Sequence, residues 1–154
     1  MYPPNFELLY SDASWRKTWT HILPGRFSSS PYTGLLFFEQ STGYAEIYDT
    51  DGQGRIVAPP LQIYNPLGGR AQWTHVVPGL FGSSGLTGIL LYDQPTGFAR
   101  FFECIGAGLL SQLSEYSDWR DTWTQIVPGL FTNRKASSLL FYSPSEGYGE
   151  LCIN

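Results

Sequence analysis

The chain has 154 residues, a formal net charge of −4 and only nine Lys and Arg residues, which form no basic run. This charge offers no electrostatic footprint for a phosphate backbone and argues against nucleic acid as a partner. Aromatic residues make up 16% and charged residues 14% of the chain, whereas an average globular domain has roughly 25% charged residues. The length is typical of one domain whose core needs no metal or disulfide.

The N-terminus has no basic stretch followed by an apolar run, and no segment approaches the roughly eighteen apolar residues of a membrane span. We therefore expect a soluble protein that does not enter the membrane and has no visible signal peptide. It would be cytoplasmic or secreted by a non-classical route. Cys104 and Cys152 stand at different positions of the repeat described next, so we expect two buried free thiols and no disulfide.

Three copies of one motif dominate the sequence. They begin at Trp19, Trp73 and Trp123, 54 and 50 residues apart, and each reads Trp-Thr, then His or Gln, two apolar residues, Pro-Gly, one variable residue and Phe. A period of about 50 is typical of arrays whose units bury their apolar faces by stacking on copies. We therefore predict a single domain of three repeats, 15–64, 69–116 and 119–154, the last completed by 1–14.

In the first repeat, the pattern predicts four short antiparallel strands. The expected strands are 18–23, 34–38, 44–48 and 55–64. Pro24 should end the first strand because proline cannot donate to a ladder, and Gly43 supplies the positive φ of a tight hairpin turn. Pro59 and Pro60 place the fourth strand at an outer edge.

The second and third repeats follow the same plan. The expected strands are 88–92, 98–102 and 109–116, and then 138–142 and 148–151. The third repeat stops before its fourth strand. Residues 5–10 and the following Ser-Asp-Ala-Ser-Trp15 match 113–116 and the following Ser-Asp-Trp119. We therefore predict that the N-terminal segment supplies the missing strand, which would remove two sheet edges.

These repeats resemble a known family. Ser14-Trp15-Arg16 and Asp118-Trp119-Arg120, which lead into 35–38 and 139–142, are similar to blades of integrin-type FG-GAP β-propellers and of propeller lectins of the Psathyrella velutina lectin type. The resemblance implies a β-propeller that binds sugars between its blades, with a preference for acetamido or methylated sugars. Loops 28–33, 82–87 and 132–137 lack the carboxylates of the family's calcium loop, so we expect no metal and no cofactor.

Three blades are too few for a closed propeller, because natural rings have about four to eight. We therefore expect an all-β fold of three four-stranded repeats that forms a six-bladed ring as a homodimer, with each chain lending its N-terminal strand to the other. The alternative is a β-trefoil, in which the three repeats close within one chain.

No set of acid, base and nucleophile stands apart from the repeat, so we predict no enzymatic activity and no catalytic residues. His21, His75 and Gln125 share one repeat position, which indicates a structural polar group rather than a proton acceptor. Glu46 and Glu150 also match, and solvent-facing positions explain them more simply than a glycosidase, which stays a third hypothesis.

Repeated binding fits the pattern better. Lectin sites combine an aromatic ring, which packs on the C–H face of a sugar, with polar groups that bond its hydroxyls. We predict a multivalent carbohydrate-binding lectin, with a protein-interaction scaffold as the alternative. The candidate ligand-binding residues are Asp12, Trp15 and Arg16 at one junction, Asp118, Trp119 and Arg120 at another, Arg70 and Gln72 at the third, and His21 and His75.

The five tryptophans divide into two groups. Trp19, Trp73 and Trp123 recur in every repeat and are expected in the core. Trp15 and Trp119 fit a core position between blades as well as a ligand contact. At the third junction Gly69 stands in place of the tryptophan, which puts that site in doubt.

Overall fold

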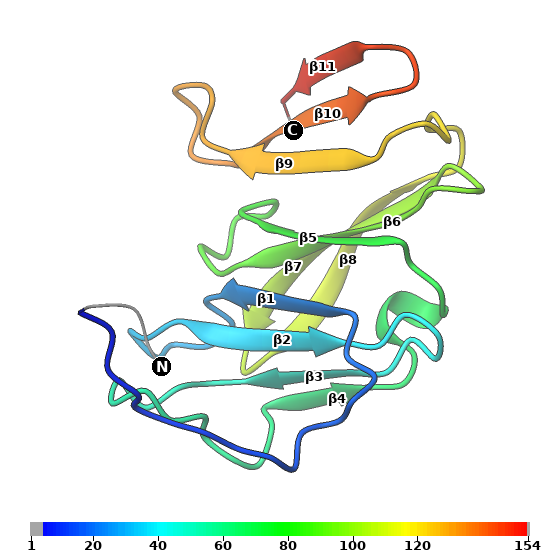
Figure 1. The fold of residues 1–154 in the computed structure, drawn as a ribbon. Coiled ribbons are helices and arrows are strands. Elements are labelled where there is room, and N and C mark those ends of the chain that lie inside the picture. Colours follow the sequence, from blue (N-terminus) through cyan, green and yellow to red (C-terminus); the bar gives the residue numbers. More distant parts are fainter. Residues whose placement is uncertain (1–4, 154) are drawn as a thin grey trace.

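A computed structural model describes residues 5–153, which form an all-β fold of three stacked antiparallel sheets (Figure 1). The first sheet contains β1 (His21–Gly25), β2 (Gly34–Phe38), β3 (Ala45–Tyr48) and β4 (Gln62–Tyr64). The middle sheet contains β5 (His75–Gly79), β6 (Gly88–Asp93), β7 (Phe98–Gly106) and β8 (Leu109–Tyr116). The last sheet contains β9 (Gln125–Gly129), β10 (Ser138–Ser143) and β11 (Tyr148–Cys152).

Each sheet is built from the strands of one repeat in chain order, and β1, β5 and β9 lie next to one another across the stack. A short 3-10 turn, η1 (Leu67–Gly69), connects the first sheet to the middle sheet. In residues 5–153, no helix has the length and apolar character needed to cross a membrane.

Most strand predictions are confirmed, and the exceptions follow from proline. The prediction that Pro24 ends the first strand was wrong, because β1 continues through Pro24, which pairs opposite Leu35. One side of β1 has no ladder partner, so the missing N–H costs no ladder bond. Pro59 and Pro60 shorten the predicted strand 55–64 to β4, preceded only by an isolated bridge between Thr50 and Ile56.

The middle sheet buries both of its faces, which explains its continuous apolar strands. On β6, Ile89 and Leu91 pack toward the first sheet, whereas Leu90 and Tyr92 pack toward the last sheet. Successive side chains of a strand point to opposite faces, so each face receives alternate residues. All four side chains are fully buried, so the two interfaces together form the core.

The same polar link joins the loops of neighbouring sheets at both interfaces. Arg26 N–H donates to Thr87 Oγ1 at 2.7 Å, and Thr87 N–H donates to the Arg26 carbonyl at 2.8 Å. Leu80 and Ser137 repeat this exchange one unit later at 2.8 and 2.9 Å. The loop after the first strand of each sheet therefore holds the loop before the second strand of the next.

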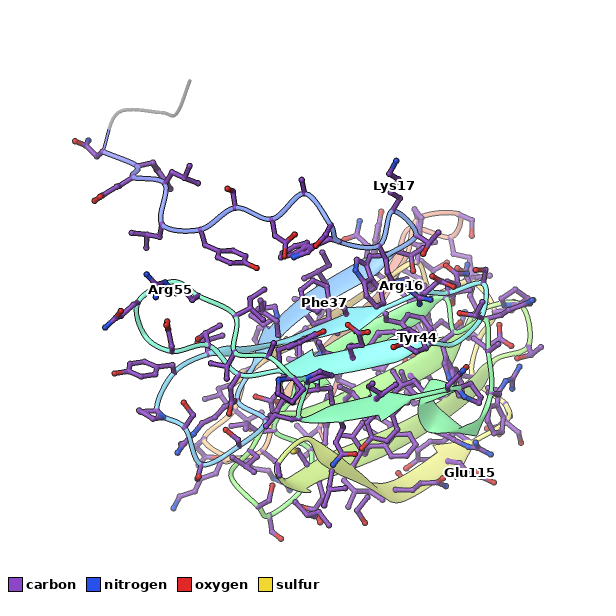
Figure 2. All side chains as sticks on the ribbon, turned by 90° about the horizontal axis from the view of Figure 1, so that it is seen from below. Arg16, Lys17, Phe37, Tyr44, Arg55 and Glu115 are labelled. Atoms are coloured by element: carbon purple, nitrogen blue, oxygen red, sulfur yellow. The ribbon has the colours of Figure 1, made fainter. Side chains whose placement is uncertain are left out.

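The N-terminal segment takes a course that the strand prediction did not anticipate. Residues 5–20 contain no strand and run across the outer face of the first sheet, while β11 lies at the opposite end of the stack (Figures 1 and 2). Leu9 contacts the turn at Gly54. Within one chain, the described residues 5–14 therefore do not pair with β11, so the prediction that 1–14 complete repeat 119–154 depends on a second chain. Residues 1–4 lie outside the described part, and completion by a second chain stays a prediction.

Both cysteines are free, as predicted, but only one is buried. Cys104 is fully enclosed between the first and middle sheets, where its thiol donates to the Phe27 carbonyl at 3.3 Å. The prediction of burial was wrong for Cys152, because β11 is the last strand of a sheet whose outer edge has no ladder partner among residues 5–153.

Candidate functional site

Two hollows, of about 290 and 370 Å³, are lined by corresponding residues of the first and third repeats. We call them the Trp15 pocket and the Trp119 pocket. Their linings share five pairs of identical residues at equal spacing: Trp15 and Trp119, Arg16 and Arg120, Trp19 and Trp123, Phe37 and Phe141, and Glu46 and Glu150. The repeat therefore builds the same kind of site twice.

The Trp119 pocket lies between two sheets. Phe101 and Tyr116 of the middle sheet form one wall, and Phe141 and Glu150 of the last sheet form the other. The Trp119 ring stands edge-on to Phe141 at 5.2 Å and stacks on Tyr116 at 5.6 Å between centroids. Trp119 therefore packs between the sheets and also lines the pocket, and its contact with a ligand stays a prediction.

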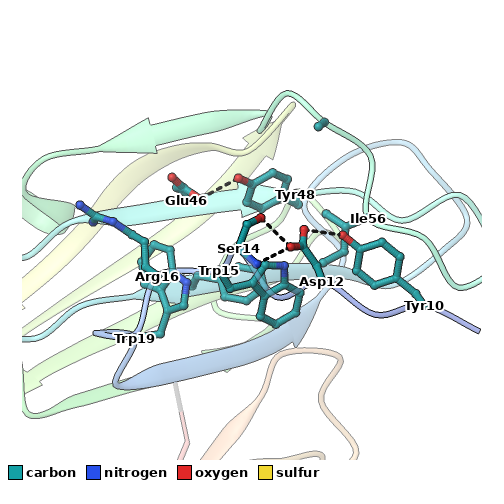
Figure 3. Close-up of a pocket in the computed structure, with 11 residues that line it drawn as sticks. Tyr10, Asp12, Ser14, Trp15, Arg16, Trp19, Glu46, Tyr48 and Ile56 are labelled. Atoms are coloured by element: carbon teal, nitrogen blue, oxygen red, sulfur yellow. Dashed lines mark hydrogen bonds between the residues drawn. The ribbon is translucent and has the colours of Figure 1, made fainter. Parts of the chain in front are cut away.

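Within the described residues, the Trp15 pocket is lined by the first sheet, by Ile56 and Ala58 of the connection between β3 and β4, and by the N-terminal segment (Figure 3). Trp15 is 41% exposed, and its ring meets Phe37 edge-on at 5.2 Å, as Trp119 meets Phe141. Tyr10 and Asp12 line it from the N-terminal segment, and among the described residues no strand of a second sheet lines it. One wall of this pocket is therefore open.

Asp12 is held as an ionised acceptor at the pocket entrance. Its Oδ1 accepts the Ser14 N–H at 2.7 Å and the Ser14 hydroxyl at 2.5 Å, and its Oδ2 accepts the Tyr10 hydroxyl at 3.1 Å. The hydrogen bonds from Ser14 lower the pKa of the Asp12 carboxyl. Asp118 lines the Trp119 pocket and is exposed. Both predicted aspartates therefore lie where a ligand hydroxyl could reach them.

The two pocket carboxylates were not among the predicted ligand residues, although they lie half-buried in these hollows. Glu46 accepts the hydroxyls of Tyr44 and Tyr48, each at 2.7 Å, and Glu150 accepts that of Tyr148 at 2.8 Å. Burial and the bond to Glu46 raise the pKa of Tyr48, so its hydroxyl stays a donor. These bonds fix the carboxylates, whose sequence interpretation as solvent-facing residues was therefore too simple.

The arginine at each junction is held in a similar way whether or not a pocket is present. Each guanidinium lies over the ring of the repeated tryptophan and over a second aromatic ring, at centroid distances of 4.1 to 5.6 Å. Each also pairs with a carboxylate: Arg16 with Glu39 at 3.5 Å, Arg70 with Asp93 at 2.6 Å and Arg120 with Glu146 at 2.6 Å. Arg16 and Arg120 line pockets, but each guanidinium already pairs with a carboxylate and lies over aromatic rings. These contacts hold the connecting segment in place.

At the junction between the first and middle sheets, the space that corresponds to a pocket is filled. Leu67 is fully buried, and Arg100, which stands at the repeat position of Glu46 and Glu150, donates from Nη1 to the Gly68 carbonyl at 2.7 Å. A side chain at Gly68 would collide with Leu91. Leu67 and Arg100 therefore fill the junction at which Gly69 replaces the tryptophan, which explains why the described residues form no tryptophan-lined pocket there.

Arg70 and Gln72, the two ligand-binding residues predicted at that junction, do not line the Trp15 pocket or the Trp119 pocket. The guanidinium of Arg70 lies 5.0 Å from the ring centroids of Trp73 and Phe98, which stack on each other, and it pairs with Asp93. Gln72 lines a shallow hollow shared with Thr74 and Asp93. The structure therefore does not bring Arg70 and Gln72 together into a third site of the same kind.

His21 and His75 bridge the sheets at the inner strands. Nε2 of His21 lies 3.1 Å from the Thr74 carbonyl, and Nε2 of His75 lies 2.8 Å from the Thr124 carbonyl. The other ring nitrogen of each contacts the hydroxyl of the preceding threonine at 2.9 Å. Burial lowers the pKa of His21, which keeps its imidazole neutral. His21 and His75 therefore link neighbouring sheets and lie outside the Trp15 and Trp119 pockets, beside a separate hollow of about 320 Å³ that both line.

In residues 5–153, no three His, Cys, Asp or Glu side chains are grouped so that they could hold a metal ion. Comparison with known proteins finds no matching family model, no matching curated protein and no matching solved structure. The chemistry of the two pockets therefore has to be inferred from their own residues.

Proposed function

We propose that the protein binds carbohydrate in the Trp15 and Trp119 pockets. The observation that carries this proposal is the repetition of one constellation: an indole ring, an edge-on phenylalanine and a carboxylate oriented by tyrosine hydroxyls. A sugar presents C–H groups that pack on an aromatic face and hydroxyls that donate to carboxylates. The site offers both kinds of contact without a metal.

The size and number of the pockets support the same function. Volumes of about 290 and 370 Å³ lie near the lower end of the range for small-molecule pockets, which suits a terminal sugar residue. Shallow sites of this kind bind weakly one at a time. Linked copies raise the apparent affinity for a surface that displays many sugars, without new contacts.

We further propose that the three sheets are blades of a β-propeller. Support comes from their separation: each sheet contains strands of one repeat in chain order, and the first strands β1, β5 and β9 lie side by side. Three blades make half of a six-bladed ring, within the usual range of about four to eight. A trefoil would instead require the strands of all three repeats to share one barrel.

A glycan array tests the carbohydrate proposal. We expect the protein to bind a subset of glycans and free monosaccharide to compete with that binding. Replacing both pocket carboxylates, Glu46→Gln and Glu150→Gln, should weaken binding about tenfold or more, because a charge-assisted hydrogen bond to each ligand is lost. The matched control is Glu115→Gln, an exposed carboxylate that pairs with Arg100 outside both pockets.

Two outcomes would contradict the carbohydrate proposal. The first is an array with no response that free sugar inhibits, and capture of a protein partner that is insensitive to sugar would then favour the scaffold function. The second is equal glycan binding by the doubly substituted variant and the Glu115→Gln control, because the carboxylates would then have no part in recognition.

A further inference from the structure

We propose that a second copy of this chain docks head to tail on the first sheet and completes the Trp15 pocket with its own last sheet. The inference rests on the blade arrangement proposed above and is independent of whether the ligand is a sugar. Three kinds of observation carry it: two exposed faces that correspond to buried interfaces, an incomplete pocket, and an uncovered strand edge.

The last sheet exposes a face that the other two sheets bury. Leu140 is 39% exposed, whereas its counterparts Leu36 and Leu90 are 0% exposed. Leu151 is 55% exposed, and its counterparts Ile47 and Phe101 are at most 7% exposed. In the first and middle sheets these positions pack against the following sheet. The last sheet therefore presents the same contact surface, which no described residue of this chain covers.

The first sheet leaves part of the complementary face exposed, beside the N-terminal segment that crosses it. Ile22 is 49% exposed, whereas its counterparts Val76 and Ile126, which pack against the preceding sheet, are 5% and 9% exposed. The two ends of the stack thus carry the two halves of an interface that the chain already builds twice internally. Contact between unlike faces of two copies is a heterologous association, which forms a ring when its rotation closes.

The Trp15 pocket shows what the second copy would add. At the complete pocket, the Trp119 ring contacts Tyr92 at 5.8 Å and Phe101 at 5.9 Å, both from the preceding sheet. The repeat places the partner's Tyr142 and the partner's Leu151 at the same positions beside Trp15. Both of these side chains, like Trp15 itself, are exposed in the single chain. The missing wall and the residues that would form it are therefore present at opposite ends of the molecule.

The polar exchange between loops at the two internal interfaces also has its two participants exposed at opposite ends of the stack. The exchange between Arg26 and Thr87, repeated by Leu80 and Ser137, predicts one between the partner's Leu130 and Thr33. Leu130 is 63% exposed and Thr33 is also exposed. The docking therefore has a defined register rather than being a general hydrophobic contact.

The N-terminal segment would become the fourth strand of the partner's last sheet. The last sheet has three strands, and β11 leaves one edge without a ladder partner in the described chain. β8 fills this place in the middle sheet, where Tyr116 pairs opposite Ala99. By the repeat, Tyr10 would pair opposite the partner's Gly149. Phe6 and Leu9 are 74% and 63% exposed, as expected of a segment that adds to an open sheet edge of another chain.

Two such contacts would close a ring of six sheets from two chains. The ring would contain four tryptophan-lined pockets, two per chain, because the junction at Leu67 is filled in each chain. The Trp15 pockets would exist in complete form only in the assembled pair. Assembly would therefore double the number of complete sites per chain.

Sedimentation of the full chain tests the docking. We expect the wild type to sediment as a species of twice the chain mass, and Leu140→Glu to sediment as one chain, because a carboxylate would then enter the apolar interface. Leu140 is partly exposed in the single chain, so the variant should still fold. Ile105→Glu, at a position that is 59% exposed near the end of β7, is the matched control and should remain paired.

A designed disulfide gives a second measurement that does not depend on weakening the interface. In a Cys152→Ser background, Thr33→Cys combined with Leu130→Cys should form covalent pairs under oxidising conditions, and either single substitution should not. The proposal is overturned by a wild type that stays a single chain at all concentrations, by unchanged pairing of Leu140→Glu, or by oxidation that gives no pair or an open ladder of longer species.

Ligand stoichiometry separates this inference from the proposed function. With any glycan identified by the array, the wild type should bind two ligands per chain and Leu140→Glu about one, at the Trp119 pocket. Sugar binding by a protein that never pairs would overturn the docking alone. A pair that forms as expected but responds to no sugar would overturn the carbohydrate proposal alone.

Discussion

The junction between the first and middle sheets and the junction between the middle and last sheets come from the same repeat, yet only the second contains a tryptophan-lined pocket among those described. Both have the arginine stacked on the repeated tryptophan, and both have the polar exchange between loops. They differ at three repeat positions. Leu67, Gly69 and Arg100 at the filled junction correspond to Ser117, Trp119 and Glu150 at the open one.

This difference shows that the scaffold and the pocket are separable. At the filled junction, the side chain of Leu67 turns into the core and the guanidinium of Arg100 bonds the backbone that a tryptophan would otherwise displace. At the open junction, the carboxylate of Glu150 and the ring of Trp119 surround a hollow instead. A few sequence differences therefore separate a junction with a pocket from a junction with a filled core, within the same stack.

The largest loss of stability is expected when the buried side chain of Leu67 is removed from the filled junction. Leu67→Ala should lower the free energy of unfolding by about 3 kcal/mol, because it removes a fully buried side chain and leaves a cavity. Denaturant unfolding measures the change. Leu113→Ala, at a position that is 42% exposed on β8, is the control and should cost less than about 1 kcal/mol. Equal losses would mean that Leu67 does not hold this junction together.

A smaller loss of stability is expected at the open junction. Trp119→Ala should cost about 2 kcal/mol, because the ring packs on Tyr116 and Phe141 but also borders the hollow. The control is Trp15→Ala, which should cost about 1 kcal/mol or less within one chain. Both variants are compared in the monomeric Leu140→Glu background by thermal and denaturant unfolding. The reverse order would show that Trp15, not Trp119, is the packed ring of the single chain.

Substitution of Arg100 tests the polar contacts that distinguish the filled junction from the open one. Arg100→Ala should cost about 1 kcal/mol, since it removes a bond to the Gly68 carbonyl and a pair with the exposed Glu115, whose contribution solvent reduces. Arg55→Ala, in an exposed turn, should be nearly neutral. Denaturant unfolding measures both variants. No difference between them would assign the filling of the junction to Leu67 alone.

The strands were predictable from sequence because alternation, turn glycines and the repeat are local signals. Gly34–Phe38 and Leu109–Tyr116 have the predicted limits. The course of β1 through Pro24 was not predicted, because the absence of a ladder partner on one side of a strand is a tertiary property. The N-terminal segment was assigned a strand from its similarity to β8, and no such strand forms where its partner edge lies at the far end of the stack.

The site was predicted in part. Trp15, Trp119 and the neighbouring Asp and Arg residues line the pockets, since their junction positions follow from the repeat. The carboxylates were missed because alternation does not tell which face of an end sheet is covered. The sequence nevertheless contained a signal: a glutamate stands at this repeat position where a tryptophan is present at the junction, and Arg100 stands there where Gly69 replaces it.

The smallest expected effect concerns His21, which bridges the first and middle sheets at the end of β1. Burial lowers the pKa of this imidazole below its ordinary value of 6.5, so the unfolded chain takes up a proton before the folded chain does. The free energy of unfolding should therefore decrease as the pH falls below about 6.5 and recover as the pH rises. His21→Gln keeps an N–H donor for the Thr74 carbonyl, as Gln125 occupies the same repeat position.

Denaturant unfolding of the wild type and His21→Gln at pH 7.5 and pH 5 measures this contribution. The variant should be within about 1 kcal/mol of the wild type at pH 7.5, because an amide replaces the neutral imidazole as hydrogen-bond donor. Its stability relative to the wild type should increase at pH 5, because it has no group that must be protonated against burial. The difference in free energy of unfolding between the two proteins could instead be the same at both pH values. In that case folding does not oppose protonation of His21, and the hydrogen bond between the sheets is insensitive to pH in this range.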